Sequence, residues 1–461
     1  MKKSYIFSTF ILFTFCLLAT SCGQPSEPYP TEEGATKIVI FTRDFEEYIN
    51  NNFYERVKYI NKDLTDGIQV DVEYIRESSF NDKIAAARDA GKAPDVYLAA
   101  YNHVYQQKQE GLCAPLNDYI SEEAFADIDD HVVTRINYDG KYYAYPYYAE
   151  PSTMLFYRKS ALQNAGIPLP SEGETWTWDD LLDACSKLRP NLGKGQWPLG
   201  MPDGGDVGWA TWGMLYNQLN GWPITDNWDA SRLDEERENM KEFLSFFSEI
   251  YDNNYAPKQG LTSKGYNNII TALLNGKVSM TLGGGFSLGS VIAEKPELLE
   301  DIGLMPCPTI DGDASKVTAT NGGWTLLIDA KSENKEKAGQ VIERLLYDVP
   351  VEEFATFFKK SGFCRISPRK SVNSYIETII TDVERPYYEV TKTVYDSSVF
   401  EPLYTWDIST QIGLLLERCV TGLNADTYDQ QIDMVHNEIN RIIAIQAWRA
   451  LTHIIKDNYV I

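Results

Sequence analysis

The chain has few of the residues that build metal centres and nucleophilic active sites. Its 461 residues include only four histidines and seven cysteines. The histidines are scattered, and neither a Ser/His/Asp signature nor a phosphate-binding P-loop is present. Five cysteines remain beyond the first 22 residues, an odd number without any Cys-x-x-Cys spacing. This pattern argues against a zinc knuckle and against a disulfide framework, so we expect mostly buried free thiols.

Positive charge is also scarce. The 42 Lys and Arg residues are outnumbered by 66 Asp and Glu, which leaves a formal charge of −24 with no concentrated basic patch. Such a chain would be repelled by phosphates, so nucleic acid is excluded as a partner. Aromatic residues are plentiful instead, with 29 Tyr and 10 Trp. Many lie in Gly- and Pro-rich segments, which indicates a binding surface built on loops.

Long apolar runs are missing beyond the amino terminus, where residues 1–22 read as a processing signal. Lys2 and Lys3 precede an apolar core over residues 6–19 that is shorter than the roughly 20 residues of a spanning helix. Ala19-Thr20-Ser21-Cys22 then resembles a bacterial lipobox, although its first position holds Ala where Leu is usual. We therefore expect lipidation at Cys22 and a flexible tether over residues 23–36. The alternative is an ordinary signal peptide with an incidental cysteine.

The body begins with alternating strands and helices. Residues 37–41, 68–75 and 95–99 are predicted strands separated by helical segments, which indicates a mostly parallel sheet. In such sheets ligands bind beyond the carboxyl ends of the strands. The polar and aromatic residues expected there are Arg43, Asp44, Tyr101 and Asn102.

A second informative stretch runs from Thr320 to Leu346. Residues 325–328 predict a buried strand, and Gly322 and Gly323 in front of it allow the backbone to bend before Trp324. Ser332 or Asn334 is expected to cap the following helix. That helix places apolar residues at spacings of three and four, namely Ala338, Val341, Ile342, Leu345 and Leu346. A capping box of Thr177 and Asp180 predicts another helix from Trp178 to Leu188.

Several segments in this order resemble the extracellular solute-binding proteins of carbohydrate ABC transporters, the maltose-binding-protein superfamily. The resemblance covers residues 37–443, and the segments that carry it are 93–97, 140–159 with its six tyrosines, 276–286, 321–346 and 362–370. It implies an α/β fold of type II, in which two lobes, each a mostly parallel sheet flanked by helices, are hinged around a central cleft. The implied lobes are 37–148 with 325–364, and 150–322 with 366–461.

The resemblance also implies a sugar site between the lobes. Its matched positions are Arg43, Asp44, Asn102, Glu150, Trp209, Trp212 and Phe286. Tyr101, at the end of a predicted strand, and Trp324 and Trp406 are the further candidate sugar contacts. Aromatic rings would cover the apolar faces of a pyranose, and charged or amide groups would bind its hydroxyls. Packing in the core is the alternative for each aromatic residue. The implied partners are a sugar, the permease of an ABC importer and the membrane reached through the lipid anchor, for a monomeric, non-enzymatic chain without a cofactor on a Gram-positive surface.

Two rival functions remain open. A glycoside hydrolase needs two opposed carboxylates, for which Glu150, Asp206 and Glu401 are available, but their spacing marks no pair. A lipid-anchored sensor or adhesin with the same body is the other. The acidic segments 127–131 and 311–313 are interpreted as solvated rather than as calcium sites.

Overall fold

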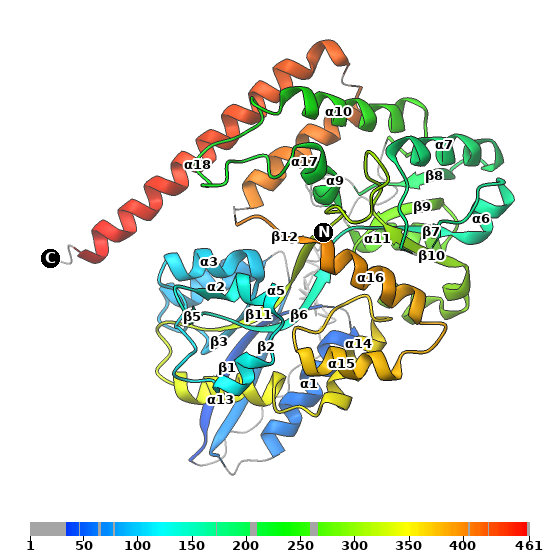
Figure 1. The fold of residues 1–461 in the computed structure, drawn as a ribbon. Coiled ribbons are helices and arrows are strands. Elements are labelled where there is room, and N and C mark those ends of the chain that lie inside the picture. Colours follow the sequence, from blue (N-terminus) through cyan, green and yellow to red (C-terminus); the bar gives the residue numbers. More distant parts are fainter. Residues whose placement is uncertain are drawn as a thin grey trace, which may run out of the picture.

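The structure is a computed structural model that describes residues 34–45, 47–62, 66–76, 79–171, 173–202, 210–258, 266–403, 406–422 and 424–458. The predicted signal segment, Cys22 and Trp209 lie outside these residues, as does the predicted tether except for its last three residues. The described chain forms two lobes, each built on its own sheet (Figure 1). The expected two-lobed α/β fold is confirmed.

The first lobe contains a six-stranded sheet in the order β12-β11-β3-β1-β2, with β6 also paired to β11. The strands are β1 (Thr36–Arg43), β2 (Ile68–Ile75), β3 (Val96–Ala100), β6 (Tyr145–Pro151), β11 (Thr320–Ile328) and β12 (Val399–Phe400). β1 is parallel to both β2 and β3, as the alternation of strands and helices predicted, whereas β11 is antiparallel to β3 and β6. The carboxyl ends of β1 and β3 therefore share one edge.

Helices cover this sheet and complete its core. They are α1 (Glu47–Lys62), α2 (Phe80–Asp89), α3 (Tyr101–Gln109), α4 (Glu122–Ala126), α5 (Asp130–Ile136), α13 (Lys335–Leu346), α14 (Val351–Lys360) and α15 (Lys370–Ile379), with a small hairpin of β4 (Asn137–Tyr138) and β5 (Lys141–Tyr142). α1 packs against α13 and α14, while α3 packs against α5.

Helix α13 confirms its predicted apolar face. All five residues expected to be buried are fully covered. The predicted cap differs: Asn334 is the N-cap, but its side chain makes no capping bond. Instead, the Ser332 hydroxyl accepts the Asn334 N–H at 3.0 Å, and both side chains donate to Asp95. The sequence pattern thus located the start of the helix. The side chains of Ser332 and Asn334 are bonded to Asp95, just before β3, instead of to the helix backbone.

The second lobe contains a four-stranded sheet in the order β10-β7-β9-β8. Its strands are β7 (Met154–Arg158), β8 (Trp197–Gly200), β9 (Val278–Gly283) and β10 (Ile302–Pro306). β7 is antiparallel to both of its neighbours, and only β8 and β9 run parallel. This sheet thus differs from the expected mostly parallel one, because its central strand enters from the other lobe rather than through a local helical crossover.

The helices of the second lobe are α6 (Lys159–Asn164), α7 (Trp178–Leu188), α9 (Trp212–Gln218), α10 (Arg237–Asp252), α11 (Tyr266–Leu274), α12 (Ser287–Glu294), α17 (Trp406–Val420) and α18 (Tyr428–Asn458), with short 3-10 turns η2 (Arg189–Asn191), η3 (Pro296–Asp301) and η4 (Ala425–Thr427). The capping box at the start of α7 is confirmed, with Thr177 and Asp180 each bonded to the other's backbone. The five described cysteines are all buried and unbridged, also as expected.

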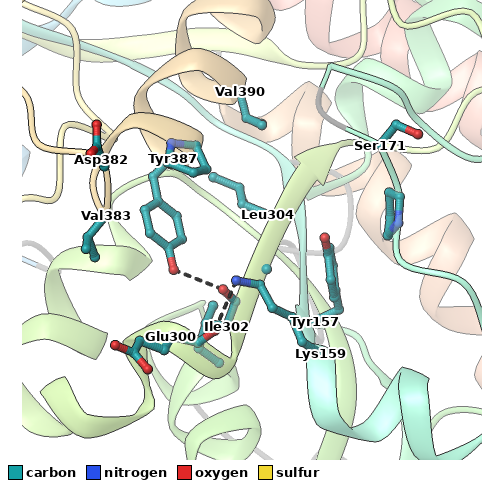
Figure 2. Close-up of a pocket in the computed structure, with 13 residues that line it drawn as sticks. Tyr157, Lys159, Ser171, Glu300, Ile302, Leu304, Asp382, Val383, Tyr387 and Val390 are labelled. Atoms are coloured by element: carbon teal, nitrogen blue, oxygen red, sulfur yellow. Dashed lines mark hydrogen bonds between the residues drawn. The ribbon is translucent and has the colours of Figure 1, made fainter.

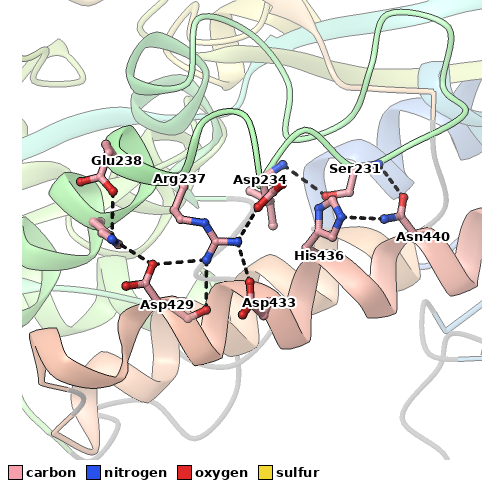
Figure 3. Close-up of polar contacts among 10 residues, drawn as sticks. Ser231, Asp234, Arg237, Glu238, Asp429, Asp433, His436 and Asn440 are labelled. Carbon is pink, nitrogen blue, oxygen red and sulfur yellow. Dashed lines mark hydrogen bonds and ion pairs between the residues drawn. The ribbon is translucent and has the colours of Figure 1, made fainter.

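The long helix α18 is held on α10 by a polar cluster (Figure 3). The Arg237 guanidinium donates to Asp234 at 2.6 Å, to Asp433 at 2.5 Å and to Asp429 at 3.3 Å. Hydrogen bonds that Arg237 donates to these carboxylates raise the pKa of Arg237 further above its usual range. The pairs are largely exposed, so they select the orientation of α18 more than they stabilise it.

The two lobes are joined by crossing strands and by α16 (Arg385–Ser397). Tyr388 and Tyr395 of this helix belong to the core of the first lobe, whereas Tyr387, Val390 and Val394 belong to a cluster around the second sheet. In Figure 1, α16 lies where the two lobes meet. Between β6 and β7, the Ser152 hydroxyl donates to the Thr320 carbonyl at 2.7 Å. The segment that links β6 to β7 is therefore bonded to the start of β11 at the junction.

Two expected lobe boundaries differ from this packing. Residues 366–380 were assigned to the second lobe, but Ile366, Val372, Ile376 and Ile380 lie in the core of the first. The expected crossing at residues 323–325 is the middle of β11, still inside the first sheet. An amphipathic helix such as α15 shows which of its faces is buried, not which lobe covers that face.

Candidate functional site

The carboxyl edge of the first sheet brings several predicted site residues together. Arg43 is the last residue of β1, and its guanidinium carbon lies 4.2 Å from the centroid of the Trp324 ring. Phe45 meets the same indole edge-on at 5.3 Å. Trp324 reaches this place because β11 pairs it with Ala100 at the end of β3 and with Tyr148 of β6. The half-buried indole is thus held by a cation and an aromatic ring, which makes it a rigid wall.

Tyr101 and its neighbours begin α3 directly after β3. Tyr101 is buried below Gly323, and its ring contacts Phe400 at 5.1 Å. Burial, followed by the charges of Asp129 and Glu150, raises the pKa of Tyr101 well above its ordinary value, so the phenol stays protonated. The half-buried Asn102 has a side-chain carbonyl oxygen that accepts no hydrogen bond from the described residues. This oxygen is itself buried, so a ligand hydroxyl could reach it only after the surrounding side chains move.

Histidine 103 was not predicted as a site residue. Burial, and then the nearby charge of Arg43, lowers the pKa of His103 to about 4. The imidazole is therefore neutral at physiological pH and offers one donor and one acceptor nitrogen. Its position two residues after Tyr101 is the only sequence signal that would have pointed to it.

Asp44 lies at the exposed rim rather than in the wall. Its carboxylate accepts a hydrogen bond from the Asn50 amide at 2.8 Å, and its backbone N–H donates to Ile75 at 2.9 Å. These bonds attach the start of α1 to the ends of two strands. The side chain remains exposed to solvent beside Arg43.

Glu150 and Phe286 meet through Arg365, a residue that sequence reasoning did not single out. Arg365 is 3% exposed, and its Nε donates to the Glu150 carboxylate at 2.9 Å. The guanidinium carbon lies 5.1 Å from the Tyr148 ring and 5.9 Å from the Phe286 ring. Glu150 and Tyr148 belong to the first sheet, whereas Phe286 follows β9 of the second. This cluster therefore joins the two lobes.

Glycines after β9 make this meeting possible. A Cβ on Gly284 would lie 2.2 Å from the Phe286 ring, and one on Gly285 would lie 2.3 Å from the Cys364 carbonyl oxygen. The Gly285 N–H also donates to the Pro151 carbonyl at 3.2 Å. A side chain at Gly285 would therefore separate β9 from the segment that carries Cys364 and Arg365, whereas one at Gly284 would displace the Phe286 ring.

The tryptophans of the second lobe differ in their placement. Trp212 is 1% exposed, lies in the core of the second lobe and meets Trp222 edge-on at 6.0 Å. It therefore does not share the wall with Trp324, because the first turn of α9 directs it inward. Trp209 lies outside the described residues, as does the side chain of Trp406, the first residue of α17. Ala210, the first described residue after position 209, packs against Phe286.

The acidic residues near the site already have partners. A Cβ on Gly322 would lie 3.4 Å from a carboxylate oxygen of Glu401, which places Glu401 over β11. Glu150 is ion-paired, which favours the charged form over the protonated form that a general acid needs. Asp206, the third candidate for a hydrolase pair, lies outside the described residues. The arrangement suits hydroxyl binding better than bond cleavage.

The acidic segment at residues 127–131 is mostly structural. Asp127 accepts hydrogen bonds from Arg369 at 2.9 Å and from Ser371, and Asp129 caps α5 and accepts from Tyr395 at 3.2 Å. Only Asp130 is largely solvated, as expected, beside Lys370. Within the described part of the chain, no group of three or more acidic, His or Cys side chains is arranged to hold a metal ion.

A separate pocket of about 380 Å³ lies beside β10 (Figure 2). Its walls include Tyr157, Leu304 and Val390, and the Tyr387 hydroxyl donates to the Leu299 carbonyl at 2.6 Å and to the Ile302 carbonyl at 3.0 Å. None of its lining residues is a predicted site residue. Its lining also combines tyrosine rings with charged groups, among them Lys159, Glu300 and Asp382. The predicted site residues lie instead at the edge of the first sheet and at the lobe junction.

Comparisons with known proteins agree with this geometry. The family described as bacterial extracellular solute-binding protein matches residues 40–358. A maltotriose-binding protein of Pyrococcus abyssi is 24% identical over 279 residues, which are 59% of this chain and 55% of that protein, so the match spans about half of that relative. A putative binding protein of Brucella abortus is 22% identical over 324 residues, 70% of this chain and 74% of the relative.

Solved structures show the same fold. A solute-binding protein of an ABC transporter from Thermotoga lettingae, bound with α-D-tagatose, superposes with a TM-score of 0.72 at 22% identity, over 89% of this chain and 100% of that one. The GacH receptor of Streptomyces glaucescens, solved unliganded and with acarbose, gives 0.73 at 19% identity, over 89% and 99%. Among the described residues, no helix has the length and apolarity needed to cross a membrane.

The matched residues cover more than half of the chain and include the second sheet, the first sheet apart from β12 and the start of β1, and the edge that carries Arg43, Tyr101 and Trp324. The fold, the interlobe junction and this match have one interpretation: the chain belongs to the bacterial extracellular solute-binding protein family.

Proposed function

We propose that this protein captures a sugar or oligosaccharide between its lobes and delivers it to the permease of an ABC importer. The observation that carries the proposal is that aromatic rings meet charged groups in two clusters: Trp324 with Arg43 at the edge of the first sheet, and Phe286 with Arg365 at the lobe junction, where Arg365 also pairs with Glu150. Such clusters match a pyranose, whose apolar C–H faces alternate with a rim of hydroxyls.

The comparisons support sugar as the ligand class. The name of the Pyrococcus relative refers to maltotriose, and the similar solved structures hold tagatose or acarbose. Identities below 25% carry no particular sugar across to this chain. We therefore propose a carbohydrate without specifying its length or linkage.

Binding would act by hinge closure. A ligand that contacts both clusters binds the closed state better and shifts the population toward it. The closed form of a monomer would then dock on the permease. The crossing strands and α16 are the segments that must bend or pivot.

Lipidation of Cys22 would anchor the protein outside the cytoplasmic membrane, with Gram-positive surfaces as the proposed setting. One similar protein, from Streptomyces antibioticus, carries the description of an uncharacterized lipoprotein, at 23% identity over 282 residues. Metabolic labelling with a radioactive fatty acid tests this point. The wild type should incorporate label and Cys22→Ser should not; label retained in the variant would refute anchoring through Cys22.

A thermal-shift screen tests sugar binding. The mature chain is heated with glucose, maltose, maltotriose, xylobiose, tagatose and mannitol in turn, with sodium phosphate as a control solute. A ligand bound only by the folded state raises the melting temperature with its concentration. Absence of any shift across carbohydrates of all these types would contradict the proposal.

Hydrolysis is the alternative that the carboxylates near Gly322 suggest. Incubation of the protein with fluorescently labelled maltotriose and xylobiose separates the two functions. A binding protein returns the labelled sugars intact, whereas shortened products would identify a glycosidase.

A further inference from the structure

Arg365 occupies the junction between the two lobes. It lies on the segment between α14 and α15, 215 residues from Glu150 in sequence, yet its Nε donates to that carboxylate at 2.9 Å. Its planar guanidinium also faces Tyr148 from the first lobe and Phe286 from the second. Both members of the ion pair are largely buried, so solvent screens the contact weakly.

We propose that Arg365 is the positioning residue of the sugar site: it holds the Glu150 carboxylate as a charged hydroxyl acceptor and couples it to Phe286 across the junction. This inference rests on the proposed sugar-binding function and deepens it. Arg365 acts through Glu150 and Phe286, whether or not it touches the sugar itself.

Glu150 needs such a partner because of its other neighbours. The buried phenol of Tyr101 feels its charge, and Glu401 lies over Gly322, the β11 residue that pairs with Glu150. A second carboxylate and partial burial both favour protonation of Glu150, whereas the guanidinium favours the charged form. A charged acceptor binds a sugar hydroxyl more strongly than a neutral carboxyl does.

The contact with the second lobe gives Arg365 its coupling role. Phe286 clusters with Ala210 rather than with either large core, and its ring faces the Arg365 guanidinium at 5.9 Å. The segment around Arg365 is itself fixed at the junction, since Cys364 lies against Gly285 and Ile366 pairs with Ala149. A sugar that contacts Glu150 and Phe286 would therefore meet one connected unit built from both lobes.

The test compares Arg365→Met, Arg365→Lys and Glu150→Gln, and the double variant of Arg365→Met with Glu150→Gln. Arg88→Met is the matched control, because Arg88 makes a similar 2.8 Å bond to the buried Asp329 at the far end of β11. Affinity is measured by titration calorimetry between pH 5 and pH 8. The probe is the panel sugar with the largest thermal shift, or maltotriose if several are equal.

Arg365→Met should weaken binding 10- to 100-fold at pH 7 and weaken it further as the pH falls toward 5, because Glu150 then takes up a proton more readily. Arg365→Lys should retain the flat pH profile of the wild type with an intermediate affinity. Glu150→Gln alone should weaken sugar binding. The double variant should bind the sugar about as weakly as Arg365→Met alone. Arg88→Met should lower the melting temperature and leave affinity unchanged.

Equal affinity and equal pH profiles for Arg365→Met and wild type would overturn this inference while the proposed function stands. Additive losses in the double variant would also overturn it, because they would mean that Arg365 does not act through Glu150. A wild type that binds none of the sugars would overturn the proposed function and this inference together.

Discussion

Trp324 combines two properties of a ligand-contacting residue, partial exposure and fixed orientation. Its indole is held by Arg43 and Phe45 and retains an uncovered part at the sheet edge. Trp324→Ala should weaken sugar binding about 10- to 100-fold, or roughly 1.4–2.8 kcal/mol. It should cost only about 1 kcal/mol of unfolding free energy. Titration calorimetry and urea unfolding measure the two effects; an unchanged affinity would remove Trp324 from the site.

Trp212 has the opposite surroundings, although the sequence suggested the same role. Because it is fully buried beside Trp222, Trp212→Ala should lower the free energy of unfolding by about 3–5 kcal/mol. Urea denaturation followed by circular dichroism measures this loss. If the variant is as stable as wild type but loses sugar affinity, Trp212 contacts the sugar and is not a core residue.

At the scale of elements, β11 depends on a glycine in its middle. Gly323 has a φ of +124°, and a Cβ there would lie 2.2 Å from the Tyr148 carbonyl oxygen and 2.9 Å from the Tyr101 ring. Gly323→Ala should therefore destabilise the fold by roughly 2–4 kcal/mol.

Gly322→Ala is the matched control for this prediction. Its Cβ would meet the flexible end of Glu401 at 3.4 Å and the Glu150 carbonyl oxygen at 3.9 Å, both ordinary contact distances, so the melting temperature of the variant should stay within a few degrees of wild type. Differential scanning calorimetry compares the two. Equal decreases in melting temperature for the two variants would mean that the close contacts of Tyr148 and Tyr101 with Gly323 are not the reason for the destabilisation.

The acidic segment before α5 predicts a pH effect on stability. Burial opposes the charge of Asp127, but hydrogen bonds from Ser371 and Arg369 outweigh it and lower the pKa of Asp127. A carboxylate with a lowered folded pKa stabilises the fold above its unfolded value of about 3.9 and loses that contribution as the pH falls through the folded pKa. Stability held by Asp127 should therefore disappear below about pH 4.

Asp127→Asn tests this link. It should be about 1–2 kcal/mol less stable than wild type at pH 7, a figure reduced for the partial exposure of the site. The gap should close between pH 4 and pH 2 in urea unfolding curves. A gap that stays constant over that range would show that the charge of Asp127 does not contribute.

At the scale of the whole molecule, α16 makes the two lobes one folding unit. Its residues enter both cores, with Tyr388 on one side and Val394 on the other. We expect a single urea transition, observed equally by tryptophan fluorescence, to which Trp324 of the first lobe and several tryptophans of the second lobe contribute, and by a dye attached at Tyr59→Cys. Residue 59 is 72% exposed in the first lobe, and the five native cysteines of the described chain are buried.

Val394→Ala should shift both signals together, by about 1–3 kcal/mol. The exposed change Tyr59→Cys alone should leave the transition in place. Two separated transitions in either protein would mean that the lobes unfold independently.

Local patterns in the sequence determined a large part of this structure. Buried runs predicted β1, β2 and β3, a capping box predicted the start of α7, and 3–4 spacing predicted the covered face of α13. The edge holding Arg43 and Tyr101 follows as well, because parallel strands align their carboxyl ends. These features depend on neighbours within a few residues, so the sequence alone contains them.

Only the tertiary structure decided which surface covers each buried side chain. The local sequence shows that Trp212, Trp324 and one face of α15 are apolar. It does not show whether the core of one lobe, the core of the other lobe or a ligand covers them. The pairing of Arg365 with Glu150 joins segments 215 residues apart, and no local rule predicts such a contact. The lobe boundary and the composition of the site were therefore settled by long-range packing.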